Sequence, residues 1–143
     1  MAKNNWRVSE SEIEFIKKAI KNKLTGKYLI KFETELAKKF KTNYAIAVNS
    51  GTSALHTALY ALGIKAGDEV IVPPLTFSAT AFAVMFLGAK PVFADVDIET
   101  FNICPKSIEK RINKKTKAII TVSIFGLIPD MVEILNLKKK YTL

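Results

Sequence analysis

Cysteine is almost absent from this chain of 143 residues, which contains only Cys104. A single cysteine excludes an internal disulfide and fits a reducing compartment, so we expect a cytoplasmic protein in which Cys104 is a small buried side chain. Long apolar runs are absent as well: the longest ones, residues 76–89 and 118–129, fall short of the roughly 20 residues that a membrane span needs. No apolar stretch follows the first charged residues, which argues against a signal peptide. We therefore expect no membrane partner.

Arginine is scarce among the basic residues. Of 22 lysines and arginines only Arg7 and Arg111 are arginines, although the formal net charge is +9. Guanidinium groups are the favoured readers of phosphates and base edges, and the lysines here are spread over several helical segments without interleaved aromatics. Solvated helix faces explain this charge, so the sequence predicts no nucleic-acid partner. A basic nucleic-acid-binding module is the alternative that charge alone suggests.

Two helical patterns precede an alternation of strands and helices. Apolar residues recur at helical spacing over residues 9–23, where Ser9 and Glu12 form a candidate capping box, and again over residues 32–40. From residue 42 onward the pattern predicts strands at 44–48, 69–73, 90–97 and 117–125. It predicts helices at about 52–62, 76–88, 104–112 and 131–140, with Asp130 as the N-cap of the last one.

This alternation predicts a single, incomplete α/β unit over residues 1–143. Its parts are N-terminal helices at 1–41 and alternating strands and helices at 42–143. Strands that alternate with helices favour a mostly parallel sheet with helices on both faces. The pattern stops directly after a helix, at the place where we expect the next strand.

Small polar residues lie where the first predicted strand passes into a helix. Gly51 leaves room for an anion to approach the backbone, and Thr52 and Ser53 add hydroxyl donors at the first turn of the helix. Such a turn suits a phosphate group; the alternative is that residues 50–53 only cap the helix. The chain lacks the patterns G-x-x-x-x-G-K-[ST] and G-x-G-x-x-G, which argues against a nucleotide P-loop and a dinucleotide fold.

An aromatic residue, Phe77, follows the second predicted strand. Two prolines, Pro73 and Pro74, hold the chain extended before it. Because ligands gather at the carboxyl edge of a parallel sheet, Phe77 could stack there on a flat ring next to a phosphate. Taken alone, a phenylalanine is more often a core residue, and this alternative stays open.

Several motifs in this order resemble the DegT/DnrJ/EryC1/StrS family of sugar aminotransferases. They are "NSGTSALHTAL", "GDEVIVPPLTFSATAFAVMFLGAKPVFADVD", "TFNICPKSIEKRI", "TKAIITVSIFG" and "DMVEI". The similarity runs from about residue 25 to the end. It implies the N-terminal part of the large domain of the aspartate-aminotransferase (type I) fold, with pyridoxal 5′-phosphate (PLP) as the cofactor.

The resemblance also implies roles for individual residues. Gly51, Thr52 and Ser53 would contact the cofactor phosphate, and Phe77 would cover one face of the pyridine ring. A weaker match places Thr25-Gly26 close to the substrate.

Other matched positions suggest no catalytic role or depart from the family pattern. His56 matches a common family residue without a catalytic role, and we expect it to be structural. Ser123 stands where relatives often carry a histidine, and Leu127 stands where they often carry a polar residue. These departures put polar contacts to the substrate in doubt.

Two further family residues match no position between Met1 and Leu143. They are the Asp that pairs with the pyridine nitrogen and the Lys that forms a Schiff base with the cofactor. The resemblance therefore implies the N-terminal part of an aminotransferase that acts on a keto-sugar nucleotide, with glutamate as the common amino donor. Such enzymes supply surface polysaccharide or amino-sugar pathways.

We expect residues 1–143 to be inactive alone, as the product of a truncated or interrupted gene. The alternative is a non-catalytic partner that completes a site with a longer homologue. From the family's sheet we also expect missing strands to separate the strands at 69–73 and 90–97 from those at 44–48 and 117–125. The isolated chain should then self-associate or pair with a longer homologous chain.

Overall fold

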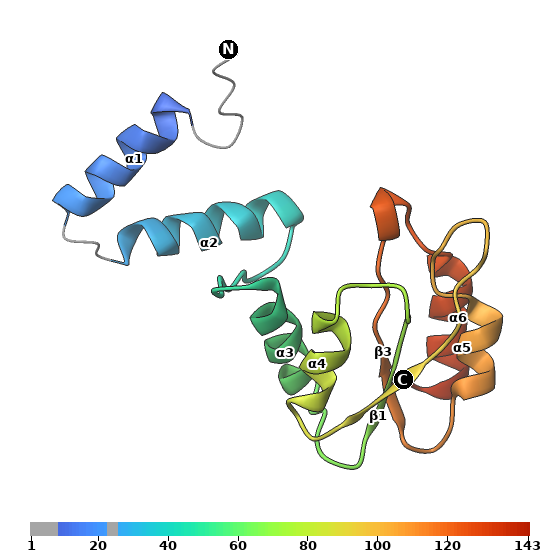
Figure 1. The fold of residues 1–143 in the computed structure, drawn as a ribbon. Helices are drawn as coiled ribbons and strands as arrows, with labels where there is room; N and C mark the ends of the chain where they lie inside the picture. The colour runs from blue at the N-terminus through green and yellow to red at the C-terminus, as the bar shows by residue number, and fades with distance from the viewer. Residues whose placement is uncertain (1–8, 23–25) are drawn as a thin grey trace. The chain divides into compact units, whose positions relative to one another are not determined.

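A computed structural model describes residues 9–22 and 26–143. By internal contacts the chain divides into two compact units, residues 1–47 and 48–143, and each is described by itself (Figure 1). The single α/β unit predicted for residues 1–143 stays a prediction. Across the described ranges, every helix is too short or too polar to cross a membrane.

The first unit contains two amphipathic helices, α1 (Glu10–Lys21) and α2 (Lys27–Phe40). The predicted capping box at the start of α1 is confirmed, since the Ser9 N–H donates to Glu12 Oε2 over 2.7 Å. The C-cap of α2 is Lys41, whose φ of 53° lies in the left-handed region. Neither helix buries a residue, and several of their apolar side chains, such as Ile16 and Phe32, are more than half exposed.

The strand predicted at residues 44–48 does not form, and this expectation was wrong. The segment is irregular, and Tyr44 and Ile46 are 85% and 75% exposed. A strand exists only where a neighbouring strand accepts its N–H groups and donates to its C=O groups. Here side chains take that place: the Ala47 N–H donates to Glu33 Oε1 over 2.8 Å, and the Tyr44 carbonyl accepts from the Thr42 hydroxyl over 3.0 Å.

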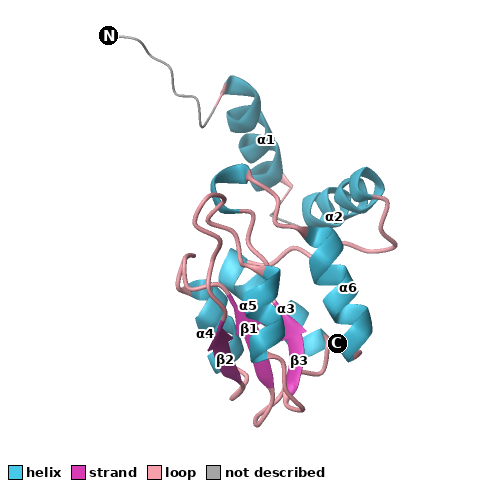
Figure 2. Ribbon diagram, turned by 90° about the vertical axis from the view of Figure 1, so that its right-hand side faces the viewer, coloured by secondary structure: helices cyan, strands magenta, loops and turns pink. Residues whose placement is uncertain are grey.

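The second unit contains a parallel sheet of three strands in the order β2-β1-β3 (Figure 2). The strands are β1 (Glu69–Val72), β2 (Lys90–Phe93) and β3 (Thr116–Ile119). Strand β1 is central, with Ile71 paired to Val92 on one side and to Ile119 on the other. This direct pairing of β1 with β3 overturns the expectation that missing strands separate them. Val70, Ile71 and Val72 are fully buried, as expected for the apolar part of a strand whose sheet is covered by helices on both faces.

Helices cover both faces of this sheet, as predicted (Figure 1). Helices α3 (Gly51–Ala61) and α4 (Ala79–Met85) lie on one face, and α5 (Pro105–Arg111) and α6 (Met131–Tyr141) lie on the other. Because side chains of a strand alternate between faces, Val70 and Val72 enter the first core and Ile71 enters the second. The first core also contains Leu59, Ile64, Ala83, Val84 and Ala89; the second contains Ala94, Ile103, Ile108, Ile134 and Leu137.

Capping residues set the ends of the helices, and pairing with neighbouring strands sets the ends of the strands. The predicted cap of α6 is confirmed, because Asp130 Oδ1 accepts from the Glu133 N–H over 3.1 Å. The strand predicted at 117–125 is shorter, since β3 pairs only along β1 and ends at Ile119. A short 3₁₀ helix, η1 (Ile124–Gly126), follows it. Cys104, expected to be buried, is half-buried at the start of α5.

Candidate phosphate-binding site at the carboxyl edge of the sheet

Residues 49–53 lead into α3 and form its first turn, and we call them the α3 turn. Ser50 has an extended backbone with φ −160° and ψ 160°, and its hydroxyl oxygen accepts from the Ser53 N–H over 3.1 Å. The Ser53 hydroxyl donates to Asn49 Oδ1 over 2.7 Å. The helix cap that we considered as an alternative is therefore present, and it uses Ser50 and Ser53.

Other donors of the α3 turn remain available. The N–H groups of Gly51 and Thr52 are the first two of the helix, so they have no acceptor within it. Among the described residues, neither N–H group meets another acceptor, and the hydroxyl of the half-buried Thr52 has no partner. Three donors thus remain at the positive end of the α3 dipole.

Gly51 fits an anion at this position. Its φ lies outside the left-handed region, and a Cβ added to it would meet no heavy atom within 4 Å. Neither backbone strain nor packing among the described residues therefore requires a glycine here. The first turn of α3 contains no acidic residue that would repel an anion. Neutral donors, a helix dipole and unfilled space together suit a phosphate group.

Phe77 lies in the loop between β1 and α4, and its side chain is 79% exposed. The alternative that Phe77 belongs to the core is therefore wrong. Its backbone is held, because the Phe77 carbonyl accepts from the Thr80 N–H over 3.1 Å. Figure 1 shows that this loop and the start of α3 lie at the same edge of the sheet, where the chain leaves β1. The fold thus brings Phe77 and the α3 turn to one edge, as the sequence predicted.

The remaining predicted substrate residues lie in the first unit. Thr25 falls outside the described residues. Gly26 is the exposed N-cap of α2, and its carbonyl accepts from the Ile30 N–H over 2.9 Å. A substrate role for this pair stays a prediction.

His56 packs in the second unit without a catalytic partner among the described residues. It is half-buried on α3, and its ring meets the Phe86 ring edge to face with 6.2 Å between centroids. An aromatic contact of this kind suits the structural role that we expected.

Sequence reasoning missed Asn102, which organises the loop after β3. Its side chain is buried, its Nδ2 donates to the Leu127 carbonyl over 3.1 Å, and its Oδ1 accepts from the Ile124 N–H over 3.3 Å. The loop also contains Ser123, which is exposed as the N-cap of η1. A signal existed in the sequence, since an asparagine within the apolar run "TFNIC" needs polar partners once buried.

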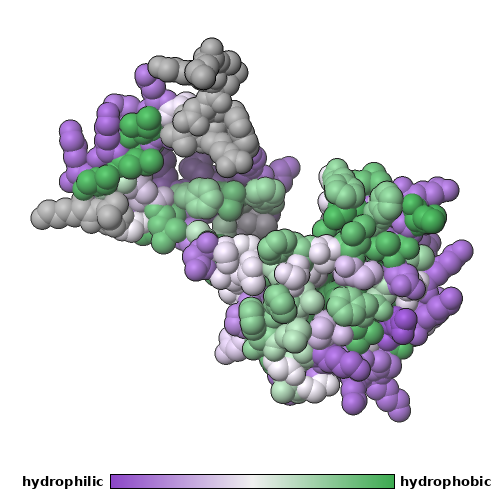
Figure 3. All heavy atoms as spheres, viewed as in Figure 1, coloured by the Kyte–Doolittle hydropathy of each residue, from purple (hydrophilic) through white to green (hydrophobic). Residues whose placement is uncertain are grey.

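Two phenylalanines beside Asn102 adopt unusual backbone conformations. Phe101 and Phe125 have φ values of 57° and 51°, and their rings meet edge to face at 6.4 Å. Phe125 is 86% exposed. Figure 3 shows large apolar side chains gathered over η1 and the loop before α5. The exposed apolar residues of these loops are Ile98, Phe101, Phe125, Leu127 and Ile128.

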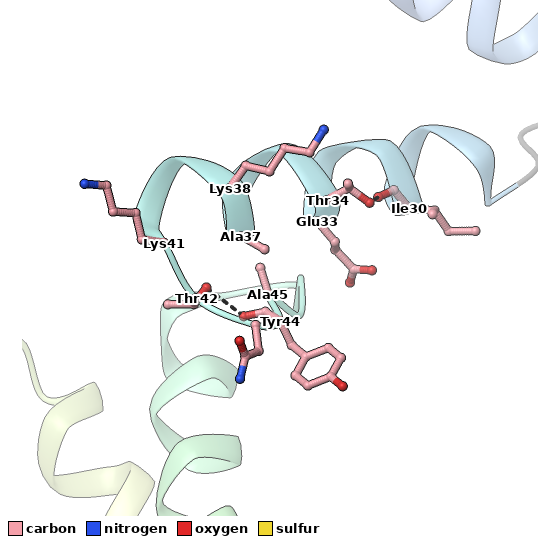
Figure 4. Close-up of a pocket in the computed structure, with 10 residues that line it drawn as sticks. Ile30, Glu33, Thr34, Ala37, Lys38, Lys41, Thr42, Tyr44 and Ala45 are labelled. Atoms are coloured by element: carbon pink, nitrogen blue, oxygen red, sulfur yellow. Dashed lines mark hydrogen bonds between the residues drawn. The ribbon is translucent and has the colours of Figure 1, made fainter.

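A hollow of about 390 Å³ lies in the first unit, between α2 and residues 41–45 (Figure 4). Its lining includes Glu33, Lys38 and Lys41, and the Glu33 carboxylate is already engaged by the Ala47 N–H. None of the predicted site residues lines this hollow. Within the described ranges, no three His, Cys, Asp or Glu side chains gather to hold a metal ion. The α3 turn is therefore the stronger candidate for a ligand site.

Comparison with known sequences identifies relatives of this chain. The sequence model of the DegT/DnrJ/EryC1/StrS aminotransferase family matches residues 7–143. GDP-perosamine synthase of Escherichia coli O157:H7 is 47% identical over 118 residues, which cover 82% of this chain and 32% of that protein. The chain thus spans about a third of the length of the curated relatives that it matches.

Solved structures share the fold. An aminotransferase from Psychrobacter cryohalolentis gives a TM-score of 0.90 at 42% identity, over 95% of this chain and 35% of that one. The Bacillus subtilis protein NtdA, solved with bound cofactor PMP, gives 0.86 at 37% identity, over 95% of this chain and 33% of that one. The predicted fold class, an α/β part of the aspartate-aminotransferase (type I) fold, is confirmed.

Proposed function

The chain belongs to the DegT/DnrJ/EryC1/StrS aminotransferase family, and on this premise we propose that residues 1–143 form the part of a PLP-dependent sugar aminotransferase that holds the cofactor phosphate. The observation that carries the proposal is the set of unpartnered donors at the start of α3. The space next to the Gly51 Cα contains no heavy atom of the described residues within 4 Å of an added Cβ, and the loop that contains the exposed Phe77 lies at the same edge of the sheet.

Each residue of this edge has a proposed task. Gly51, Thr52 and Ser53 form the turn that holds the phosphate. Its available donors are the N–H groups of Gly51 and Thr52 and the Thr52 hydroxyl, which bind an anion without a counter-charge. Phe77 covers one face of the pyridine ring and excludes water from it. When bound, PLP supplies the electron sink that the transfer of an amino group needs. Thr25 and Gly26 lie close to the substrate.

The proposed substrate is a keto-sugar nucleotide, and the proposed amino donor is glutamate. The name of the relative GDP-perosamine synthase supports a nucleotide-linked sugar. The product would enter surface polysaccharide or amino-sugar synthesis. We assign the reaction to the cytoplasm, because a chain with one cysteine suits a reducing compartment.

Residues 1–143 by themselves should not complete this reaction. Transamination needs an amine that binds PLP covalently and moves a proton, and a carboxylate that keeps the pyridine nitrogen protonated. No lysine of the chain stands at the family position for that task. One of them, Lys140, is even held in its charged form, since a hydrogen bond to Glu109 raises the pKa of its ammonium group.

A chimera tests the proposal directly. Residues of this chain would replace the matching segment of E. coli GDP-perosamine synthase, to which they are 47% identical. We expect the chimera to bind PLP and to transfer an amino group from glutamate, and Thr52→Ala within it to weaken PLP binding. A folded chimera that binds PLP normally despite Thr52→Ala and Ser53→Ala would contradict the assigned cofactor site.

The chain without the rest of the enzyme is the matched negative control. Borohydride reduction in the presence of PLP should label no single lysine stoichiometrically. Full labelling of one lysine together with turnover of a keto-sugar nucleotide would contradict the expected inactivity.

The second candidate is a non-catalytic partner that completes a site with a longer homologue. The exposed apolar faces of α1 and α2 favour it, because such surfaces drive association. Mixing the chain with intact GDP-perosamine synthase and measuring sedimentation and turnover separates the two candidates. Both candidates allow a complex with the longer homologue, but only a partner that completes its site would change the rate of turnover.

A further inference from the structure

The two hydroxyl residues of the α3 turn have different surroundings. The Thr52 hydroxyl has no partner among the described residues. The Ser53 hydroxyl lies 2.7 Å from Asn49 Oδ1 and 2.9 Å from Ser50 Oγ, both within the turn. The Ser53 N–H is also engaged, by Ser50 Oγ at 3.1 Å.

A serine hydroxyl carries a single proton. The Ser53 proton is donated to Asn49 Oδ1, so it is not available to a phosphate oxygen at the same time. Redirecting it would break the hydrogen bond to Asn49, and that loss would offset part of the gain at the phosphate. Thr52 has no such competing acceptor among the described residues.

We propose that Asn49 is a positioning residue for the cofactor phosphate. By accepting the Ser53 hydroxyl proton, Asn49 fixes the shape of the α3 turn and leaves the Thr52 hydroxyl, with the N–H groups of Gly51 and Thr52, to bind the phosphate. Ser53 then serves the phosphate through the order of the turn rather than by donating its proton. This inference rests on the proposed function, because it requires a phosphate at the α3 turn.

The probe for the test is pyridoxine 5′-phosphate, which has no aldehyde and therefore does not react with the lysines of the chain. Pyridoxine, without the phosphate, is the matched control. Binding is measured by calorimetry, and the contact is located by the shifts of backbone amide resonances in NMR spectra. We expect the phosphate compound to move the Gly51 and Thr52 amide resonances most, and pyridoxine to leave them in place.

Variants then separate Thr52 from Ser53. A lost hydrogen bond to a charged group corresponds to about tenfold or more in affinity, so Thr52→Val should weaken binding by at least about tenfold. Ser53→Ala disturbs only the order of the turn and should weaken binding about threefold. In an Asn49→Ala background the Ser53 hydroxyl keeps only Ser50 Oγ as a neighbour, and that oxygen already accepts the Ser53 N–H. The hydroxyl can then turn to the phosphate, so the same Ser53→Ala change should cost about tenfold.

The loss of affinity caused by Ser53→Ala should depend on the residue at position 49. This dependence distinguishes a residue that positions the phosphate donors from one that only stabilises the fold. Asn49→Asp keeps an acceptor oxygen but adds a negative charge that lowers the affinity for any anion. Measured relative to Asn49→Asp alone, Ser53→Ala should therefore again cost only about threefold, even if Asn49→Ala fails to fold. Equal Ser53→Ala costs of tenfold in the native and Asn49→Asp backgrounds would overturn the inference and leave the cofactor site intact. If pyridoxine 5′-phosphate moves none of the turn amides, the proposed site fails and the inference fails with it.

Discussion

Substitution of Phe77 should affect ligand affinity more than it affects the stability of the fold. Its side chain is 79% exposed, so about a fifth of it is buried. Full burial of a phenylalanine contributes about 1.5–3 kcal/mol, and a fifth of that is about 0.3–0.6 kcal/mol. Phe77→Ala should therefore lower the free energy of unfolding by no more than about 0.6 kcal/mol.

The same substitution should have a larger effect on ligand affinity. An aromatic ring that stacks on another contributes about 0.5–1.5 kcal/mol beyond its buried area, which is about 2- to 13-fold in a dissociation constant. Affinity for pyridoxine 5′-phosphate is measured by calorimetry and stability by urea unfolding on the same samples. Phe77→Leu should recover stability but little of the affinity.

Val84 on α4 is the matched control, because it is fully buried in the first core. Val84→Ala removes two methyl groups, which costs about 1.6 kcal/mol at about 0.8 kcal/mol each, before any cavity term. It should lower stability and leave the affinity of the folded fraction nearly unchanged. The reasoning is refuted if Phe77→Ala destabilises the chain as much as Val84→Ala does, or if it leaves affinity unaltered.

Three other predictions follow from the described contacts. Asn102→Ala leaves the Leu127 carbonyl and the Ile124 N–H without their side-chain partner, so it should lower the free energy of unfolding in urea by about 1–3 kcal/mol. A loss below about 0.5 kcal/mol would contradict a stabilising role of these two hydrogen bonds. Hydrogen bonds from Lys140 and Tyr141 lower the pKa of Glu109, and the hydrogen bond to Glu109 raises the pKa of Lys140. The contribution of Glu109 to stability should therefore be present above the ordinary carboxyl range and vanish as the pH falls through the lowered value; that of Lys140 should vanish at strongly alkaline pH. Glu109→Gln should thus destabilise the chain near neutral pH but not in acid, unlike Glu99→Gln, and a pH-independent effect would contradict the pairing. Finally, the exposed apolar faces of α1 and α2 should make the isolated chain self-associate in sedimentation; a sharp monomer with slow amide exchange throughout would refute this.

The sequence by itself determined the features that depend on residues close together in the chain. The capping box of Ser9 and Glu12 and the cap of Asp130 need partners only three residues away, so the pattern contains all the information. The apolar run of residues 70–72 in β1 favoured a strand that is covered on both faces. The α3 turn was predicted because its composition alone, a glycine followed by two hydroxyl residues, suits an anion.

Only the tertiary structure decided what depends on residues far apart. The segment at 44–48 has strand-like composition, but strand formation requires a partner, and among the described residues only the side chains of Glu33 and Thr42 meet its backbone. The pairing of β1 with both β2 and β3 could not be read from the order of the elements, because sheet order is set by how helices cross the two faces. Phe77 was ambiguous for the same reason: the exposure of one side chain depends on which distant residues pack over it, and the described residues leave 79% of it exposed.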